Sequence, residues 1–304
     1  MNIWKIYQLL QNLVELLSFV PRKIVQAFLV FVISVLIVIA GYDIPASVAV
    51  SKDSSTYRTF TDWCLNKETL QSGTRDIVNE MLRLTATSDC KQASLKLSEI
   101  ESFSSSSSNI SDITPLKFMT NLSELYLSIN QISDLSPLKS LTHLYVLVLN
   151  NNQISDLGPL MSLSNLGKLY LSNNKIVRIN PLKSLTKLFH LYLSNNQISD
   201  ISPLGNLTNL VRLELDNNQI SDISPLRYLT NLFPELRLHN NQISDISPLR
   251  YLTQLEAMTL HNNQIVDISP LKYLTKMEVV LLYNNPIANK SCPLQPESIC
   301  KFDY

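Results

Sequence analysis

The chain has 304 residues, of which 45% are apolar, and its 25 acidic and 25 basic residues give a formal net charge of zero. A chain without a basic excess gives no electrostatic reason to bind nucleic acid, and we predict no nucleic-acid partner. Only 5 glycines are present and no glycine-rich phosphate-binding string occurs, so we exclude the usual nucleotide-binding loops and predict no cofactor.

An apolar segment near the N-terminus predicts export of the rest of the chain. Residues 24–41 are almost uninterruptedly apolar and about as long as the shortest membrane-spanning helices. Basic residues outnumber acidic ones ahead of this segment, so the positive-inside rule leaves the N-terminus in the cytoplasm. Small residues at 46–49 could form a cleavage site, which leaves a retained anchor and a cleaved leader both open. We assign residues 1–49 to a cytoplasmic leader plus this hydrophobic helix, with the membrane as its partner, and expect the following domain to be membrane-anchored or secreted.

Residues 50–109 predict a polar linker, a helical cap and a degenerate first repeat. The helical spacing breaks at Ser72-Gly73, and Thr74 is suited to cap the second helix of the cap. We expect this cap to cover the first layer of leucines, which would otherwise contact water. Apolar residues then occupy the leucine positions of a poorly matched repeat at Leu97, Ile100 and Phe103.

The rest of the chain is built on a 22-residue repeat. Its isoleucine recurs with that step, except for one step of 23 residues, at Ile110, Ile132, Ile154, Ile176, Ile198, Ile220, Ile243, Ile265 and Ile287. One unit offers side chains worth roughly 10–20 kcal/mol of burial, whereas ordering its backbone costs at least about 20 kcal/mol. A single unit therefore cannot fold alone, and the units must stack into a solenoid that shares its leucine layers. We assign eight repeats to residues 110–286.

The repeat follows the pattern L-x-x-L-x-L-x-x-N-x-I, as at Leu188, Leu191, Leu193, Asn196 and Ile198. This pattern resembles the leucine-rich repeat, and the ISDISPL segment is similar to the internalin-like class. The predicted fold is an α/β leucine-rich-repeat solenoid, in which each L-x-L forms a short parallel strand on the concave face. The Ser-Pro-Leu elements would begin 3₁₀ turns on the convex face. The resemblance implies an exported repeat protein but carries no known activity.

One asparagine in each repeat predicts a structural ladder. An amide has donors and an acceptor, so it can bind turn backbone groups of its own repeat and of the next one. The asparagines are Asn130, Asn152, Asn174, Asn196, Asn218, Asn241, Asn263 and Asn285.

Four cysteines flank the repeats in two pairs. Cys64 and Cys90 precede the repeats, and Cys292 and Cys300 follow them. A pair at each end predicts two disulfide-bonded caps, the second within residues 287–304, and disulfides indicate an oxidising compartment. The strings WC…DCxxA and CPLQPESIC around these cysteines resemble exported internalin-like proteins of cyanobacteria.

The outward-facing residues of the predicted strands form the candidate ligand-binding surface. The first repeats carry aromatic and hydroxyl side chains there, and the later repeats carry charged residues and histidines. Aromatic side chains on a rigid sheet are typical anchors for protein or glycan ligands, although exposed aromatic residues also simply favour strands. We predict ligand contacts at Tyr126, Tyr145, Tyr170, Phe189, Tyr192, Glu214, Asp216, Arg237, His239, His261 and Tyr283.

Asp216, His239 and His261 form the one arrangement that suggests chemistry. Neighbouring strands lie about 4.8 Å apart, so these side chains could share a metal ion. Solvated surface residues are the simpler interpretation, and no hydrolase or metalloprotease motif accompanies them. We therefore predict no catalytic residue and no metal site.

The 23-residue unit has its extra residue within Phe233–Leu236. A bulge there would deform the concave sheet at its midpoint, while a tolerated insertion is equally compatible with the sequence.

A column of basic residues lies on the predicted convex side, and tyrosines follow three of them. The basic residues are Lys117, Lys139, Lys183, Arg227, Arg250 and Lys272. Aspartates in the same repeats nearly cancel this charge, which favours solvated structural charge over a stripe that faces a membrane or a polymer.

Together these features predict a non-enzymatic scaffold that is exported or tethered to the membrane and binds a protein or glycan through its concave face. The first alternative is a cytosolic regulatory subunit that binds a phosphatase-like enzyme, which the apolar leader and the paired cysteines oppose. The second is a weak metal-dependent site at Asp216, His239 and His261, and the third is a purely structural role in the cell envelope. The fold does not supply the identity of the ligand.

Overall fold

The computed structural model describes residues 57–303 of the chain. The predicted leader with its membrane segment 24–41, and most of the predicted linker, lie outside the described residues. Among residues 57–303, no helix is both long enough and apolar enough to cross a membrane.

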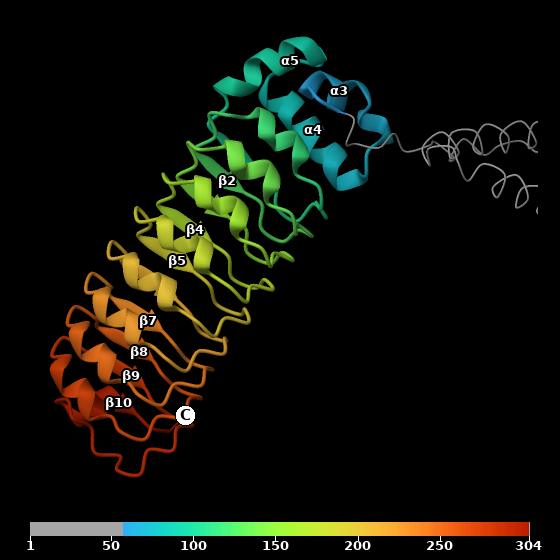
Figure 1. The fold of residues 1–304 in the computed structure, drawn as a ribbon. Helices are drawn as coiled ribbons and strands as arrows, with labels where there is room; N and C mark the ends of the chain where they lie inside the picture. Colours follow the sequence, from blue (N-terminus) through green and yellow to red (C-terminus); the bar gives the residue numbers. More distant parts are fainter. Residues whose placement is uncertain (1–56, 304) are drawn as a thin grey trace, which may run out of the picture. The chain divides into compact units, whose positions relative to one another are not determined.

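One parallel sheet runs through the described part of the chain, with its ten strands in sequence order. Each strand pairs with the same positions of the next repeat, so that Leu169, for example, lies opposite Leu191. Figure 1 shows the strands along one side of the stack and the 3₁₀ turns along the other. We call these sides the concave and the convex face, as predicted. The strands are β1 (Ser102–Ser104), β2 (Glu124–Tyr126), β3 (Val146–Val148), β4 (Lys168–Tyr170), β5 (His190–Tyr192), β6 (Arg212–Glu214), β7 (Glu235–Arg237), β8 (Ala257–Thr259), β9 (Val279–Leu281) and β10 (Cys300–Lys301).

The convex face consists of five-residue 3₁₀ turns that begin with a proline at the first or second position. Proline suits this place because its fixed φ matches a helical turn and its missing N–H would have no partner there. An aspartate precedes most turns, and its carboxylate accepts the N–H of the residue two positions later, as from Ser224 to Asp222 (2.8 Å). The turns are Thr114–Phe118, Ser136–Ser140, Gly158–Ser162, Asn180–Ser184, Ser202–Asn206, Ser224–Tyr228, Ser247–Tyr251 and Ser269–Tyr273.

Between the two faces, the repeat leucines and isoleucines form one continuous buried core. Each repeat adds one layer to it, since the leucines on either side of an outward strand residue are almost fully buried. The parallel-strand solenoid with 3₁₀ turns is therefore confirmed.

The repeat asparagines connect neighbouring layers through their side chains. Asn152 accepts the N–H of Ile132 in the preceding repeat (3.0 Å) and donates to the carbonyls of Leu127 (2.9 Å) and Leu149 (3.0 Å). The same three contacts recur from repeat to repeat. Each amide thus satisfies backbone groups that the turn would otherwise leave buried and unpaired.

Three helices cap the N-terminal end of the stack: α3 (Phe60–Leu65), α4 (Ser72–Leu84) and α5 (Cys90–Lys96). They lie beside the first strands in Figure 1. The sequence indicated two helices and missed α5, which begins after Asp89, whose carboxylate accepts the N–H groups of Lys91 and Gln92. Beyond the cap, Phe103 on β1 is buried opposite Leu125, in the position of a strand leucine.

The predicted break at Ser72-Gly73 is wrong, because these residues form the first turn of α4. Thr74 is not the N-cap; it lies inside the helix, where its buried hydroxyl donates to the carbonyl of Asp112 (3.5 Å). A Cβ on Gly73 would lie 2.8 Å from the Cα of Ile110. The glycine therefore serves close packing of α4 against the first repeat and not a break in the helix.

Both predicted disulfides are present. Cys64 on α3 is bonded to Cys90 on α5, and Cys292 is bonded to Cys300 on β10, the last strand of the sheet. Each bond fixes a segment that covers one end of the leucine core.

Candidate ligand-binding face

Two tyrosines on neighbouring strands form a stacked pair on the concave face. Tyr170 on β4 and Tyr192 on β5 are direct partners in the strand register, and their rings are 4.5 Å apart and nearly parallel (6°). Both lie between buried leucines, which forces them outward. Tyr126 occupies the same column on β2, where its hydroxyl donates to Glu124 (3.0 Å).

A second aromatic pair flanks these tyrosines at the entry to the strands. The rings of Tyr145 and Phe189, which are two repeats apart, have their centroids 6.0 Å from each other. Gly167 occupies the corresponding position in the repeat between them. A Cβ on this residue would lie 2.5 Å from a Tyr145 ring carbon and 2.6 Å from a Phe189 ring carbon. The missing side chain at Gly167 therefore allows the two rings to converge. Our prediction included both rings and missed the glycine, although its position one repeat from each was readable in the sequence.

The predicted contacts leave out another outward column, formed by the first residues of several strands. This column contains Glu124, Lys168, His190, Arg212 and Glu235. His190 lies against Phe189, with ring centroids 4.6 Å apart, and its Nδ1 is buried without a hydrogen-bond partner. Burial lowers the pKa of His190, and the charges of Lys168 and Arg212 lower it further. The alternation of inward and outward residues would have revealed this column.

A bulge at the midpoint of the sheet separates the aromatic half from the polar half. In β7 the register with β6 includes only Leu213–Leu236 and Glu214–Arg237, so the pairing of Arg212 with Glu235 is lost. The extra residue and Pro234, which has no N–H to donate, cause this loss. The strands here border a hollow of about 110 Å³ that is lined by Tyr192, Arg212, Leu213, Glu214, Glu235 and Arg237.

Arg237 joins the two carboxylates of this hollow. Its guanidinium lies 3.4 Å from Glu214 and 3.0 Å from Glu235. Burial raises the pKa of Glu214, and the charge of Arg237 opposes that effect. The guanidinium is thus held in place by its own chain and offers further donors to a ligand.

Two histidines and a tyrosine form a stacked column over β7 to β9. The rings of His239 and His261 are 4.3 Å apart (15°), and those of His261 and Tyr283 are also 4.3 Å apart (18°). His239 Nδ1 forms a hydrogen bond with Thr259 Oγ1 (2.9 Å), and its Nε2 lies 3.6 Å from Asp216. Burial lowers the pKa of both histidines; the charge of Asp216 opposes that effect in each.

The side chains of Asp216, His239 and His261 are not arranged around a common point where one metal ion could bind. Stacked imidazoles direct their nitrogen lone pairs side by side within parallel planes, so the lone pairs do not converge on one ion. Asp216 is buried and already accepts hydrogen bonds from Ser194 Oγ (2.7 Å) and Asn217 Nδ2 (2.6 Å). No group of His, Cys, Asp and Glu that could hold a metal ion occurs within residues 57–303.

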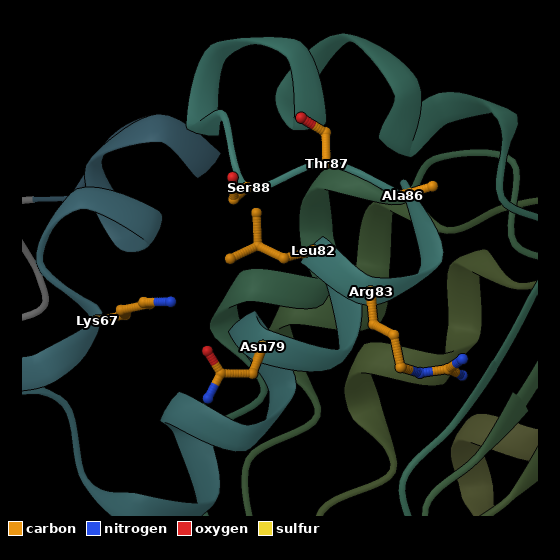
Figure 2. Close-up of a pocket in the computed structure, with 7 residues that line it drawn as sticks. All are labelled: Lys67, Asn79, Leu82, Arg83, Ala86, Thr87 and Ser88. Atoms are coloured by element: carbon orange, nitrogen blue, oxygen red, sulfur yellow. The ribbon is translucent and has the colours of Figure 1, made fainter.

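A larger depression, of about 480 Å³, lies on the helical cap (Figure 2). In the view of Figure 2, Leu82 lies in the middle of the depression, Lys67, Asn79 and Arg83 line its lower part, and residues 86–88 line its upper part. Arg83 points away from its middle and is paired with Glu80 (2.6 Å). None of the predicted contact residues lines this depression, and the concave face remains the candidate site.

Two leucine-rich repeat family models match the chain, one at residues 120–160, 186–228 and 235–273 and the other at residues 142–198. Among solved structures, the chain is similar to an internalin C2 from Listeria monocytogenes, with 38% identity over 67% of this chain and 91% of that one and a TM-score of 0.64. An internalin (inlF) from the same species is 30% identical, with 70% of each chain covered and a TM-score of 0.61. No match was found among curated protein sequences.

A more distant similarity extends to a plant receptor. The ectodomain of the Arabidopsis thaliana receptor kinase GASSHO1/SCHENGEN3, solved in complex with Casparian strip integrity factor 2, is 30% identical over 58% of this chain and 23% of that one. Its TM-score is 0.53.

Proposed function

This chain belongs to the internalin-like leucine-rich repeat proteins, and we propose that it binds a protein ligand through its concave face, without catalysis and outside the cytoplasm. The observation that carries the proposal is the stacked pair Tyr170–Tyr192, flanked by Tyr145 and Phe189 over Gly167. Such rings provide large contact areas and lose little conformational entropy on binding, because their neighbours already hold them.

The polar half of the face would select the ligand. Arg237 and Glu214 lie beside Tyr192 around the hollow at the bulge, where a ligand side chain could enter. Charged groups around an aromatic centre contribute specificity and association rate more than affinity. The receptor ectodomain that was solved in complex with Casparian strip integrity factor 2 supports a protein ligand.

The two disulfides support a compartment outside the cytoplasm, because disulfides persist in an oxidising environment. We also propose that residues 24–41 direct export of the domain, either as a retained membrane anchor or as part of a cleaved leader. Free thiols in protein isolated under alkylating conditions would instead favour the cytosolic regulatory subunit.

The test is chemical crosslinking of the full-length protein on its native cells, followed by identification of the captured proteins. We expect the double variant Tyr170→Ala/Tyr192→Ala to capture at least about tenfold less of the partner protein than the wild type does. Such a decrease is the usual effect of removing side chains at an interface hot spot. Met161→Ala/Val266→Ala is the control, since it removes two exposed apolar side chains that lie outside the strands. Capture that survives in the first variant would contradict the proposal. Behaviour like the wild type in all variants would favour a purely structural role.

A further inference from the structure

Three consecutive repeats present the same pair of side chains at the end of their convex turns. In each pair a cation lies over the ring of the tyrosine that follows it, at 5.6 Å for Arg227–Tyr228, 5.0 Å for Arg250–Tyr251 and 5.1 Å for Lys272–Tyr273. The tyrosines are 56%, 46% and 49% exposed, which is high for such large side chains. We call these six residues the cation–tyrosine stripe.

The aspartates that nearly cancel the charge of the stripe form hydrogen bonds within the same turns. Asp222, Asp245 and Asp267 lie at the start of the same turns, where each accepts the N–H and the hydroxyl of the serine two positions later. Their carboxylates are thereby engaged with the turn backbone. Within residues 57–303, no ion pair joins them to the cations of the stripe. Arg227 donates its Nε–H to the carbonyl of Ser224 (2.8 Å), and its other guanidinium donors, with Arg250 and Lys272, remain available to a ligand.

A hollow marks the N-terminal end of the stripe. In the preceding repeat, Gly205 and Asn206 replace the cation and the tyrosine, and a space of about 460 Å³ opens between the two turns. A Cβ on Gly205 would lie 3.4 Å from a ring carbon of Tyr228, so the glycine leaves one edge of that ring uncovered. Ser202 and Ser224 also line this space and offer hydroxyl groups.

We propose that the cation–tyrosine stripe binds a linear acidic polysaccharide. Identical groups at a constant step match a ligand that repeats along its length, and a single protein side chain could not satisfy all three pairs. Tyrosine rings contact the apolar faces of sugars, while guanidinium and ammonium groups pair with carboxylates or sulfates. This surface is separate from the concave face and does not depend on the proposed protein ligand.

The local charge balance favours a polysaccharide over nucleic acid. Nucleic-acid binding draws most of its affinity from many phosphate contacts and therefore needs a net positive surface. At each turn of the stripe one aspartate accompanies one cation, so the net charge of the turn is about zero. A polymer of lower charge density, whose neutral faces also contact the rings, fits this arrangement better.

The experiment is a binding titration of the full chain in detergent with polygalacturonate and with heparin fragments, beside neutral dextran and single-stranded DNA. We expect binding to at least one acidic polysaccharide, weakened by salt, and no binding to dextran. Arg250→Ala/Lys272→Ala and Tyr251→Ala/Tyr273→Ala should each weaken it by at least about tenfold. Lys139→Ala/Lys183→Ala is the matched control, because it removes two cations from the same column at repeats that lack the tyrosine, and it should stay within about twofold.

Three results would overturn the proposal. Equal weakening by both cation pairs would show unspecific charge attraction, and tighter binding to single-stranded DNA would show the wrong class of polymer. Wild-type protein that binds neither acidic polysaccharide would exclude the site itself. Thermal unfolding that matches the wild type shows that each exposed variant is folded.

Discussion

A single backbone position in each repeat adopts the left-handed conformation. Just before each ladder asparagine, φ lies between 55° and 59°, and asparagine occupies this position in every repeat but the first. Asparagine tolerates this region because its side chain can bind the local backbone. The exception is Ile129, a β-branched residue at φ 59° that is also 57% exposed. The first repeat therefore contains local strain that its neighbours avoid.

We expect Ile129→Asn to stabilise the protein by about 1 kcal/mol, because the left-handed region costs a β-branched residue more than it costs asparagine. Urea unfolding followed by circular dichroism measures the change. The reverse substitution Asn151→Ile, at φ 57°, should destabilise by a similar amount. An unfolding midpoint for Ile129→Asn that equals or falls below that of the wild type would contradict the strain.

At the scale of strands, the sheet brings together residues that are one repeat apart in the sequence. His239 and His261 stack because β7 and β8 pair in register. The three histidines with a lowered pKa, which are these two and His190, lie on the strands or close to their ends. Burial is the main cause that lowers the pKa of each one. Asp216, Glu235 and Arg237 also face His239, so the carboxylates oppose the lowered pKa and the guanidinium adds to it.

Stability should fall as the pH drops below about 6.5, the pKa of histidine in an unfolded chain. Below this pH the histidines of the unfolded state bind protons, whereas those of the native state, with their lowered pKa values, bind them only at a lower pH. The free energy of unfolding is therefore highest above about pH 6.5 and decreases as the pH falls below it. Urea midpoints at pH 7.5 and pH 5.5 measure the effect. We expect His239→Gln/His261→Gln to reduce the difference and His143→Gln, on an exposed loop, to preserve it. An unchanged difference in the double variant would show that other groups cause it.

At the scale of the whole domain, stability depends on how the two ends of the core are closed. A repeat contacts mainly its neighbours, so an uncovered terminal layer frays first. The described structure closes one end with the helices joined by Cys64–Cys90, and the other with β10, which Cys292–Cys300 holds.

Removal of either disulfide should therefore destabilise the domain by about 3 kcal/mol and loosen the end that it covers. Cys64→Ser/Cys90→Ser should raise hydrogen exchange in β1 and β2 far more than in β8, while Cys292→Ser/Cys300→Ser should do the reverse. Uniform loss of protection along the sheet would show that the domain unfolds as one cooperative unit.

The periodicity of the sequence determined the architecture, the asparagine ladder and the faces of the strands, because each 22-residue repeat cannot fold alone and must stack on the next one. Position outside the repeats determined the pairing of the cysteines. Tertiary structure alone decided how α4 packs at Gly73, how Gly167 lets two rings converge and how His239 and His261 stack. These features depend on distances between side chains of different repeats. A linear pattern places residues on a face, but only the packed fold sets the separation and orientation of their side chains, such as the stacking of the two imidazoles.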